Sequence, residues 1–188
     1  QAESKDLPLP GSVQRFDAPE PGARSPRNAN YDIDVRLDHA ARSLSGHQTI
    51  RWRNTSATPT SELQFHLYWN AWRNPDSTWL RERKMSRNYT APPQDGWGAM
   101  DVSAVRLREP SGSTRDLTSQ MRFIAPDDGN AQDRTVMAVP LGRSVGPNET
   151  IEVELTWSAR IPRPVARTSA IEDDYFIAQW FPKLGVLE

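Results

Sequence analysis

The chain of 188 residues has a net charge of −1, from 23 Lys and Arg against 24 Asp and Glu, and it contains no cysteine. Charge that is balanced and spread along the chain argues against a nucleic-acid-binding face and against a polybasic membrane anchor. The lack of cysteine excludes disulfides, thiolate catalysis and Cys-ligated zinc within these residues, and no apolar run approaches the roughly 20 residues that a membrane-spanning helix needs.

Residues 1–30 are rich in Pro, Gly, Ser and Ala and show almost no hydrophobic periodicity. This composition predicts an extended arm and not a central strand, because proline removes a donor from the hydrogen-bond ladder. The polar, proline-bearing start and the lack of cysteine lead us to expect a periplasmic or secreted protein.

Alternation of apolar and polar residues begins at Tyr31 and predicts half-buried strands. Residues 31–37 and 47–54 should form a hairpin, and residues 63–69 a third strand after a polar loop. The long connection that follows has room for one or two helical turns, with Asp76 or Ser77 as the N-cap.

The second half of the chain again alternates, with turn residues between the segments. Strands are expected around residues 97–109, 121–125, 135–141 and 150–161. About seven or eight mostly antiparallel strands with little helix predict an all-β fold, a twisted, saddle-like β-sandwich that spans residues 31–188.

The titratable residues do not form a recognisable catalytic or metal-binding motif. The three histidines have no metal-ligand spacing: they are His39, His47 and His66. The oxygen ligands of one loop could hold calcium, but they are also typical turn residues, and we favour a plain loop: these are Asp127, Asp128, Asn130 and Asp133. The carboxylates of residues 172–174 are a weak acid–base pair candidate next to the more common acidic turn. We therefore predict no catalytic residue and no metal ligand in this chain.

The tryptophans allow two interpretations. The spacing of Trp52, Trp69 and Trp157 favours core positions, whereas the Gly-Trp-Gly stretch at 96–98 could contribute to a platform on which sugars stack. Asn54, Asn88 and Asn148 fit the glycosylation pattern, which often arises by chance.

The order of the segments resembles the opening of the N-terminal domain of aminopeptidase-N-like zinc metallopeptidases, the gluzincin aminopeptidases. The matching positions are Tyr31, Ile33, Val35, Leu37, Leu44, Gly46, Ile50, Trp52, Asn54, Leu63, Phe65 and Leu67. Residues 148–162 resemble the late strand of that domain, and residues 175–186 resemble its end.

The resemblance implies a β domain that packs on a thermolysin-like catalytic domain of the same protein, beyond these residues. Peptide substrate and zinc would bind to that domain, with no cofactor in this chain. The apolar tail would begin the interdomain layer through Tyr175, Phe176, Trp180, Phe181 and Pro182. Gln179 is a weak candidate for holding the free amine of the substrate.

Two other interpretations remain open. The chain could be a stand-alone carbohydrate- or protein-binding β-sandwich module of an exported protein, which predicts exposed aromatic residues in a row. It could also be a structural, adhesion-type domain without a ligand.

Overall fold

The computed structural model describes residues 27–93, 95–163 and 168–186. Most of the predicted arm, residues 1–26, lies outside the described residues. No helix in the described ranges has the length and apolar character needed to cross a membrane.

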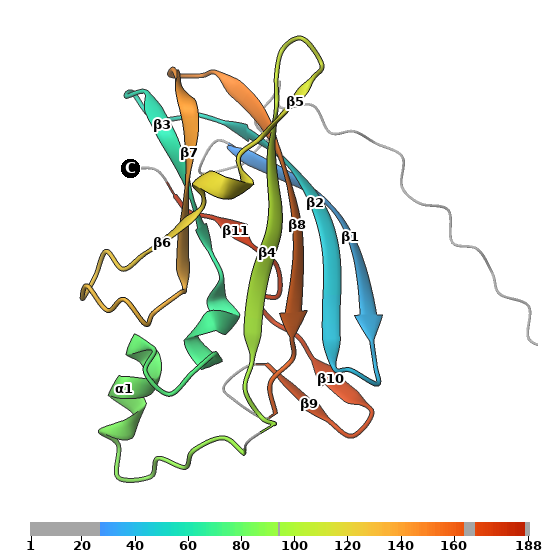
Figure 1. Cartoon of the computed structure of the whole chain (residues 1–188), viewed down its shortest axis with the longest axis vertical. Helices are drawn as coiled ribbons and strands as arrows, with labels where there is room; N and C mark the ends of the chain where they lie inside the picture. The colour runs from blue at the N-terminus through green and yellow to red at the C-terminus, as the bar shows by residue number, and fades with distance from the viewer. Residues whose placement is uncertain (1–26, 94, 164–167, 187–188) are drawn as a thin grey trace, which may run out of the picture.

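A large antiparallel sheet forms one layer of the molecule (Figure 1). Its order is β1-β2-β8-β4-β5, with bounds Ala29–Asp38, Ser43–Arg53, Thr150–Arg160, Ala99–Arg108 and Thr114–Asp116. The β1–β2 hairpin that the alternation predicted is present, and the register between the two strands has no bulge. The β4–β8 pair shifts register between Val102 and Ala104.

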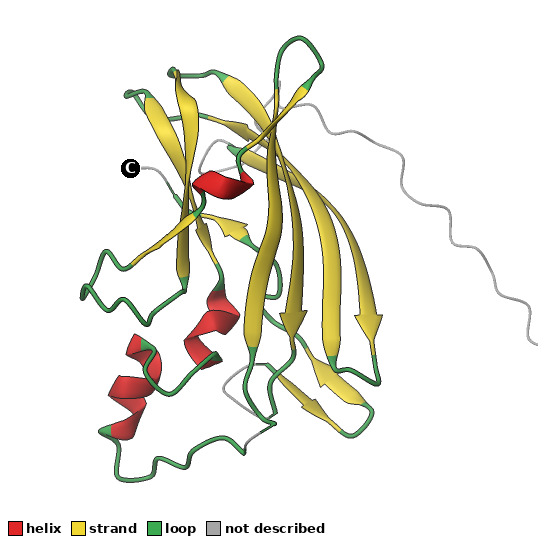
Figure 2. Cartoon of the chain, viewed as in Figure 1, coloured by secondary structure: helices red, strands yellow, loops and turns green. Residues whose placement is uncertain are grey.

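A smaller antiparallel sheet, β11-β3-β7-β6, forms the second layer. Its strands span Lys183–Leu184, Thr60–His66, Val136–Val145 and Arg122–Ile124. A separate hairpin, β9 and β10, spans Ser169–Ile171 and Asp174–Phe176. Figure 2 shows how little helix accompanies these strands: η1 (Tyr68–Trp72), α1 (Thr78–Lys84) and η2 (Thr118–Gln120).

The all-β sandwich prediction is confirmed. The described ranges contain six strands of seven or more residues, close to the segments expected from alternation, and five strands of only two or three residues. The third strand ends at His66 and not at Trp69, because the chain turns into η1 there. Ser77, one of the two predicted N-cap candidates, is the N-cap of α1: its Oγ accepts a hydrogen bond from the Leu80 N–H and donates one to the Ala71 carbonyl.

The core lies between the two sheets and is built from the inward-facing residues of each strand. Trp52, Trp69 and Trp157 are all buried, as their spacing predicted. The Trp157 indole covers the position of Gly46 on the neighbouring strand, where a Cβ atom would lie 2.3 Å from Trp157 Cζ2. The close approach of Trp157 therefore requires glycine at this position of β2.

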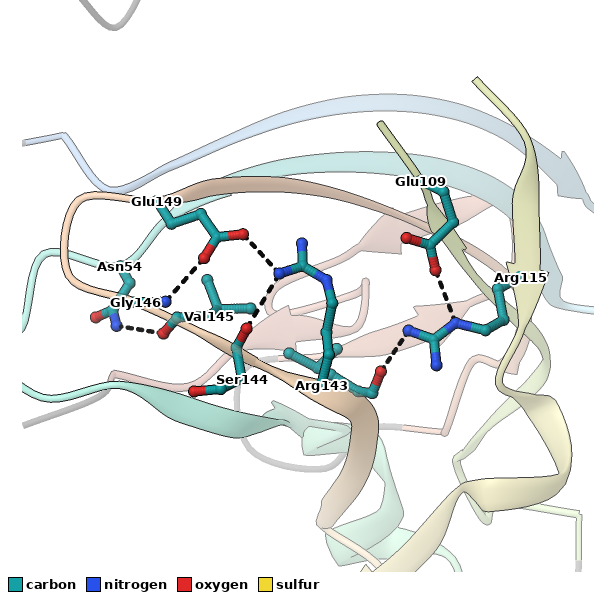
Figure 3. A network of polar contacts seen from close by, with 9 residues as sticks. Asn54, Glu109, Arg115, Arg143, Ser144, Val145, Gly146 and Glu149 are labelled. Carbon is teal, nitrogen blue, oxygen red and sulfur yellow. Dashed lines mark hydrogen bonds and ion pairs between the residues drawn. The ribbon is translucent and has the colours of Figure 1, made fainter. Parts of the chain in front are cut away.

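A polar network joins β5, β7 and the β7–β8 turn (Figure 3). Arg115 donates to Glu109 at 2.8 Å and to the Leu141 carbonyl at 2.6 Å. Glu149 accepts hydrogen bonds from Arg143, which lower the pKa of its carboxyl, and from the Gly146 N–H. The network ties the ends of several strands together.

Asn54 lies in the same network and is fully buried. Its Nδ2 donates to the Val145 carbonyl at 3.1 Å (Figure 3). The same nitrogen donates to the Thr58 carbonyl at 2.9 Å. Both amide protons are therefore engaged, whereas Asn88 and Asn148, which carry the other glycosylation patterns, are exposed.

The apolar tail packs against the hydrophobic core of the same chain. The ring of Trp180 lies 5.8 Å from that of Trp157, and the ring of Phe181 lies 5.4 Å from that of Tyr31. The buried amide of Gln48 donates to the Pro182 carbonyl at 2.8 Å. β11 then pairs with β3, so the tail completes the smaller sheet.

Candidate functional site

A hollow of about 480 Å³ opens on the outer face of the large sheet, where β2, β8 and β4 run side by side. Its lining is mostly small and polar: Ser43, Leu44, Ser45, Arg73, Ala99, Asp101, Ser158, Ala159 and Arg160. We call this feature the serine hollow. Because it lies on the face opposite the core, its polar side chains face solvent.

Strand register assembles the serine hollow from residues that are far apart in the sequence. Ser45, Ser158 and Asp101 are direct cross-strand neighbours and form one row across three strands. Ser43 and Arg160 form the next row with Ala99. Two serine hydroxyls from β2 and one from β8 therefore lie within one cross-strand patch.

Arg73 borders the serine hollow from the segment after η1, and its position is fixed. Its Nη2 donates to Asp101 Oδ1 at 2.7 Å, while its Nη1 donates to Asn70 Oδ1 at 3.1 Å and to the Met100 carbonyl at 3.2 Å. Asn70 is fully buried and also accepts from the Met100 N–H. The Arg73–Asp101 pair is thus held in place by a buried amide, and the Asp101 carboxylate stays more than half exposed.

Arg160 supplies a second guanidinium, from β8. Its Nε donates to the Trp97 carbonyl at 2.8 Å, and within the described ranges its terminal nitrogens make no hydrogen bond or ion pair. The half-exposed Trp97 belongs to the Gly-Trp-Gly stretch that the sequence marked as a possible platform. The adjoining Asp95 pairs with Arg163 and Arg42, and the Arg163 hydrogen bond lowers the pKa of its carboxyl. The loop that carries Trp97 is therefore held to the end of the sheet by ion pairs.

The hollow offers each class of hydrogen-bonding group. Serine hydroxyls both donate and accept, the Asp101 carboxylate only accepts, and the guanidinium of Arg160 only donates. The Arg73–Asp101 ion pair cancels one positive charge against one negative charge. This combination can bind a ligand that presents several hydroxyl groups, each of which can donate and accept.

The three histidines do not converge. His39 lies 3.3 Å from Asp173, His47 Nδ1 lies 3.4 Å from Thr156 Oγ1, and His66 stacks on Tyr68 with ring centroids 5.1 Å apart. Burial and the charge of Lys183 lower the pKa of His66. Within the described ranges, no group of three or more His, Asp or Glu side chains is arranged to hold a metal ion.

The carboxylates of the acidic loop at 125–133 accept hydrogen bonds from neighbouring backbone and hydroxyl groups. Asp128 accepts hydrogen bonds from the Asn130 N–H and the Thr78 hydroxyl, which lower the pKa of its carboxyl. Asp133 accepts from the N–H groups of Thr135 and Thr78. These carboxylates hold loop backbone and the start of α1.

The structure separates the other residues that the sequence singled out. Gln179 is exposed and has a φ of 54°. Trp180 and Phe181 are half-buried, Pro182 is buried, and Phe176 is 63% exposed on the β9–β10 hairpin. The acidic turn at 172–174 joins β9 to β10 and is exposed. None of these residues lines the serine hollow.

Sequence reasoning did not find the serine hollow. Alternation does assign Ser45, Asp101 and Ser158 to the polar side of their strands, but many other polar residues have the same assignment. Only the pairing of β2 with β8 and of β8 with β4 shows which of them are neighbours. That pairing joins segments more than 50 residues apart, beyond what local patterns report.

No family model matches the chain, and no curated protein matches it. A solved structure of the CBM3a-L domain with flanking linkers, from a cellulosome scaffoldin of Clostridium thermocellum, has 10% identity and a TM-score of 0.36, and the match covers 79% of this chain and 80% of that one. The family 3a carbohydrate-binding module from the scaffolding of the same organism has 12% identity and a TM-score of 0.28, over 70% of this chain and 75% of that one.

These comparisons correct the aminopeptidase-N-like assignment, which is wrong: the similar structures are carbohydrate-binding modules and not aminopeptidase domains. The expected peptidase and hydrolase function of the parent protein and its zinc depended on that assignment. So did the substrate-binding role of Gln179 and the peptide substrate. The alternation that suggested the resemblance is shared by antiparallel β-sandwiches in general, and the tail has packing partners in its own chain.

Proposed function

We propose that this chain is a non-catalytic binding module that holds a carbohydrate in the serine hollow. The observation that supports the proposal most directly is the cross-strand arrangement of Ser45, Ser158 and Asp101, with Arg160 in the adjoining row. The residues come from three strands of a well-packed sheet, so the polar groups are positioned before a ligand arrives.

A polyhydroxylated ligand fits this set of groups better than an apolar one. Sugar hydroxyls can donate to the Asp101 carboxylate and accept from the Arg160 guanidinium, and charge-assisted hydrogen bonds of this kind are stronger than neutral ones. An apolar ligand would leave those groups without partners, which costs binding free energy. The backbone carbonyl of the half-exposed Trp97 accepts the hydrogen bond of Arg160 Nε and so helps to hold this guanidinium in place.

We also propose that the module belongs to an exported protein with a further domain as its partner. The Pro-, Gly- and Ser-rich residues 1–30 have the composition of a semi-rigid spacer between domains. A binding module on such a spacer would bring its partner domain close to a carbohydrate surface.

The proposal is tested by isothermal titration of the chain with neutral and acidic oligosaccharides and by co-sedimentation with insoluble polysaccharides. We expect saturable binding that Ser45→Trp weakens at least about tenfold, because the indole would fill the hollow. Asp101→Asn should also weaken binding, since the amide cannot act as an acceptor-only group.

Thr49→Trp is the matched control. Thr49 lies on the same face of the same strand, about 13 Å along β2 from Ser45 and outside the lining of the hollow. It should leave the affinity unchanged. Equal loss in both variants, or no saturable binding to any carbohydrate, would contradict the proposal.

A further inference from the structure

The outer edge of β1 presents backbone hydrogen-bonding groups that no residue of the described ranges engages. β1 is the edge strand of the large sheet, and no described residue pairs along its outer side. The Arg53 N–H donates to the Asn28 carbonyl at 2.8 Å, in the same register as the β1–β2 ladder. Because bonded residues alternate in an antiparallel pair, even-numbered residues of β1 bond to β2, and odd-numbered residues direct their N–H and C=O groups to the free edge.

β1 lacks two of the features that normally protect an edge strand. The strand has ten residues without proline and without a bulge, two of the devices that normally block edge pairing. On its inner side, Val35 is 46% exposed and Leu37 is 42% exposed. On its outer side, Asp34 and Arg36 carry opposite charges, and no ion pair joins either of them to a residue of the described ranges.

We propose that a second copy of this chain pairs with β1 in an antiparallel manner, with Val35 opposite Val35 of the partner. In this register the odd-numbered residues exchange N–H···O=C bonds, as the free edge requires. Asp34 faces Arg36 of the partner twice across the two-fold axis, and Ile33 faces Leu37 of the partner twice on the apolar side. The one strand therefore supplies both halves of each cross-strand pair.

Charge disfavours the two registers that are centred one residue to either side of Val35. Centring the pair on Asp34 places two Asp34 side chains opposite each other, and centring it on Arg36 does the same for two guanidinium groups. Like charges directly opposite destabilise an antiparallel pair. The Val35-centred pair also brings Asp32 opposite Asp38, but the Asp38 carboxylate is engaged by the Ala41 N–H in its own turn.

The paired sheets would form one ten-stranded layer with both outer faces on the same side, because the two-fold axis is normal to the sheet. The two serine hollows would then lie about 24 Å apart, five strand spacings between one β8 and the other. If the proposed carbohydrate function holds, a polymeric ligand could occupy both hollows at once and bind more tightly than either alone.

The dimer is tested on the 188-residue chain without any carbohydrate, so that its failure is distinct from failure of the proposed function. We expect sedimentation velocity and light scattering to show a concentration-dependent dimer. Asp34→Arg or Arg36→Asp alone should each weaken it by about tenfold, because each creates two like-charge pairs. The double variant Asp34→Arg with Arg36→Asp restores opposite charges in the Val35-centred register, and should restore the dimer.

A covalent test fixes the register independently. The chain has no cysteine, so Val35→Cys introduces a single thiol that should form a disulfide-linked dimer under mild oxidation. Directly opposed bonded residues have Cα atoms about 5.5 Å apart, which suits a disulfide. Met85→Cys, at a position that is 84% exposed, should cross-link only at the rate of random collision.

A monomer at all concentrations would overturn the proposal. So would a dimer that neither single charge reversal weakens, a double variant that stays as weak as the single ones, or equal cross-linking of the two cysteine variants.

Discussion

Gly46 shows how one residue can be fixed by the side chain of another strand. A Cβ atom at Gly46 would approach Trp157 to 2.3 Å, and Trp157 is buried with little room to move. We expect Gly46→Ala to lower the free energy of unfolding by about 1–3 kcal/mol through overpacking. Urea denaturation monitored by tryptophan fluorescence measures this change.

Gly146→Ala is the control for that measurement. Its added Cβ would have only Glu149 Oε2 as a neighbour, at 3.9 Å, so the substitution should change stability by about 0.5 kcal/mol or less. A Gly46→Ala variant as stable as Gly146→Ala would show that Trp157 can move away at little cost.

The sequence predicted the environment of a residue correctly where that environment depends on a single strand or a single turn. The buried positions of Trp52 and Trp157 follow from alternation within β2 and β8, and the local sequence narrows the N-cap of α1 to Asp76 or Ser77, of which Ser77 is the cap. Prediction failed for Arg73 and Asp101, whose 2.7 Å contact depends on how η1 packs beside β4. Local patterns carry no information on that packing.

At the scale of elements, α1 depends on a single buried cap. The helix has seven residues, too few to be stable alone, and Ser77 Oγ both accepts from the Leu80 N–H and donates to the Ala71 carbonyl at 2.6 Å. Ser77→Ala should therefore reduce stability by about 1–2 kcal/mol, with faster hydrogen exchange concentrated at residues 78–84.

Ser86→Ala serves as the comparison, because Ser86 is exposed just beyond the same helix. Its effect should stay within about 0.5 kcal/mol. If the amide hydrogens of α1 exchange at the same rate in the two variants, the Ser77 cap does not stabilise the helix.

Element boundaries were predictable except where tertiary packing interrupts a pattern. Alternation from Leu63 to Trp69 suggests a strand over its whole length, and the structure keeps the inward direction of Trp69 while changing the backbone to a 3-10 turn. The same side chain can be buried by either backbone, so hydrophobic spacing alone does not distinguish them.

For the molecule as a whole, the tail decides how the two layers are joined. Phe181 packs against Tyr31 and Trp180, whereas Phe176 is 63% exposed, although both lie in the same segment. We expect Phe181→Ala to reduce the free energy of unfolding by about 1–3 kcal/mol, less than for a fully buried phenylalanine because the ring is only half covered.

Phe176→Ala removes the same atoms from a solvent-facing position and should cost about 0.5 kcal/mol or less. Thermal and urea unfolding of both variants gives the comparison. Similar losses for the two would mean that the tail contacts contribute little to stability.

The sandwich could be predicted from the sequence because it rests on local alternation, which each strand displays separately. The strand order and the partner of the tail could not, because they arise from contacts such as Gln48 with Pro182, 134 positions apart. The family resemblance was inferred from short alternating segments that many antiparallel folds share, so it conveyed the fold class without the function.

The position of β11 beside β3 has a consequence for biosynthesis. The ribosome synthesises β3 more than a hundred residues before it synthesises β11, the strand that pairs with the edge of β3. Until then the smaller sheet is incomplete and one edge of β3 has no partner strand. Distant pairings of this kind slow folding and prolong the exposure of strand edges to other chains. We therefore expect chaperones to bind the nascent chain until residues 183 and 184 have left the ribosomal exit tunnel and β11 can pair with β3.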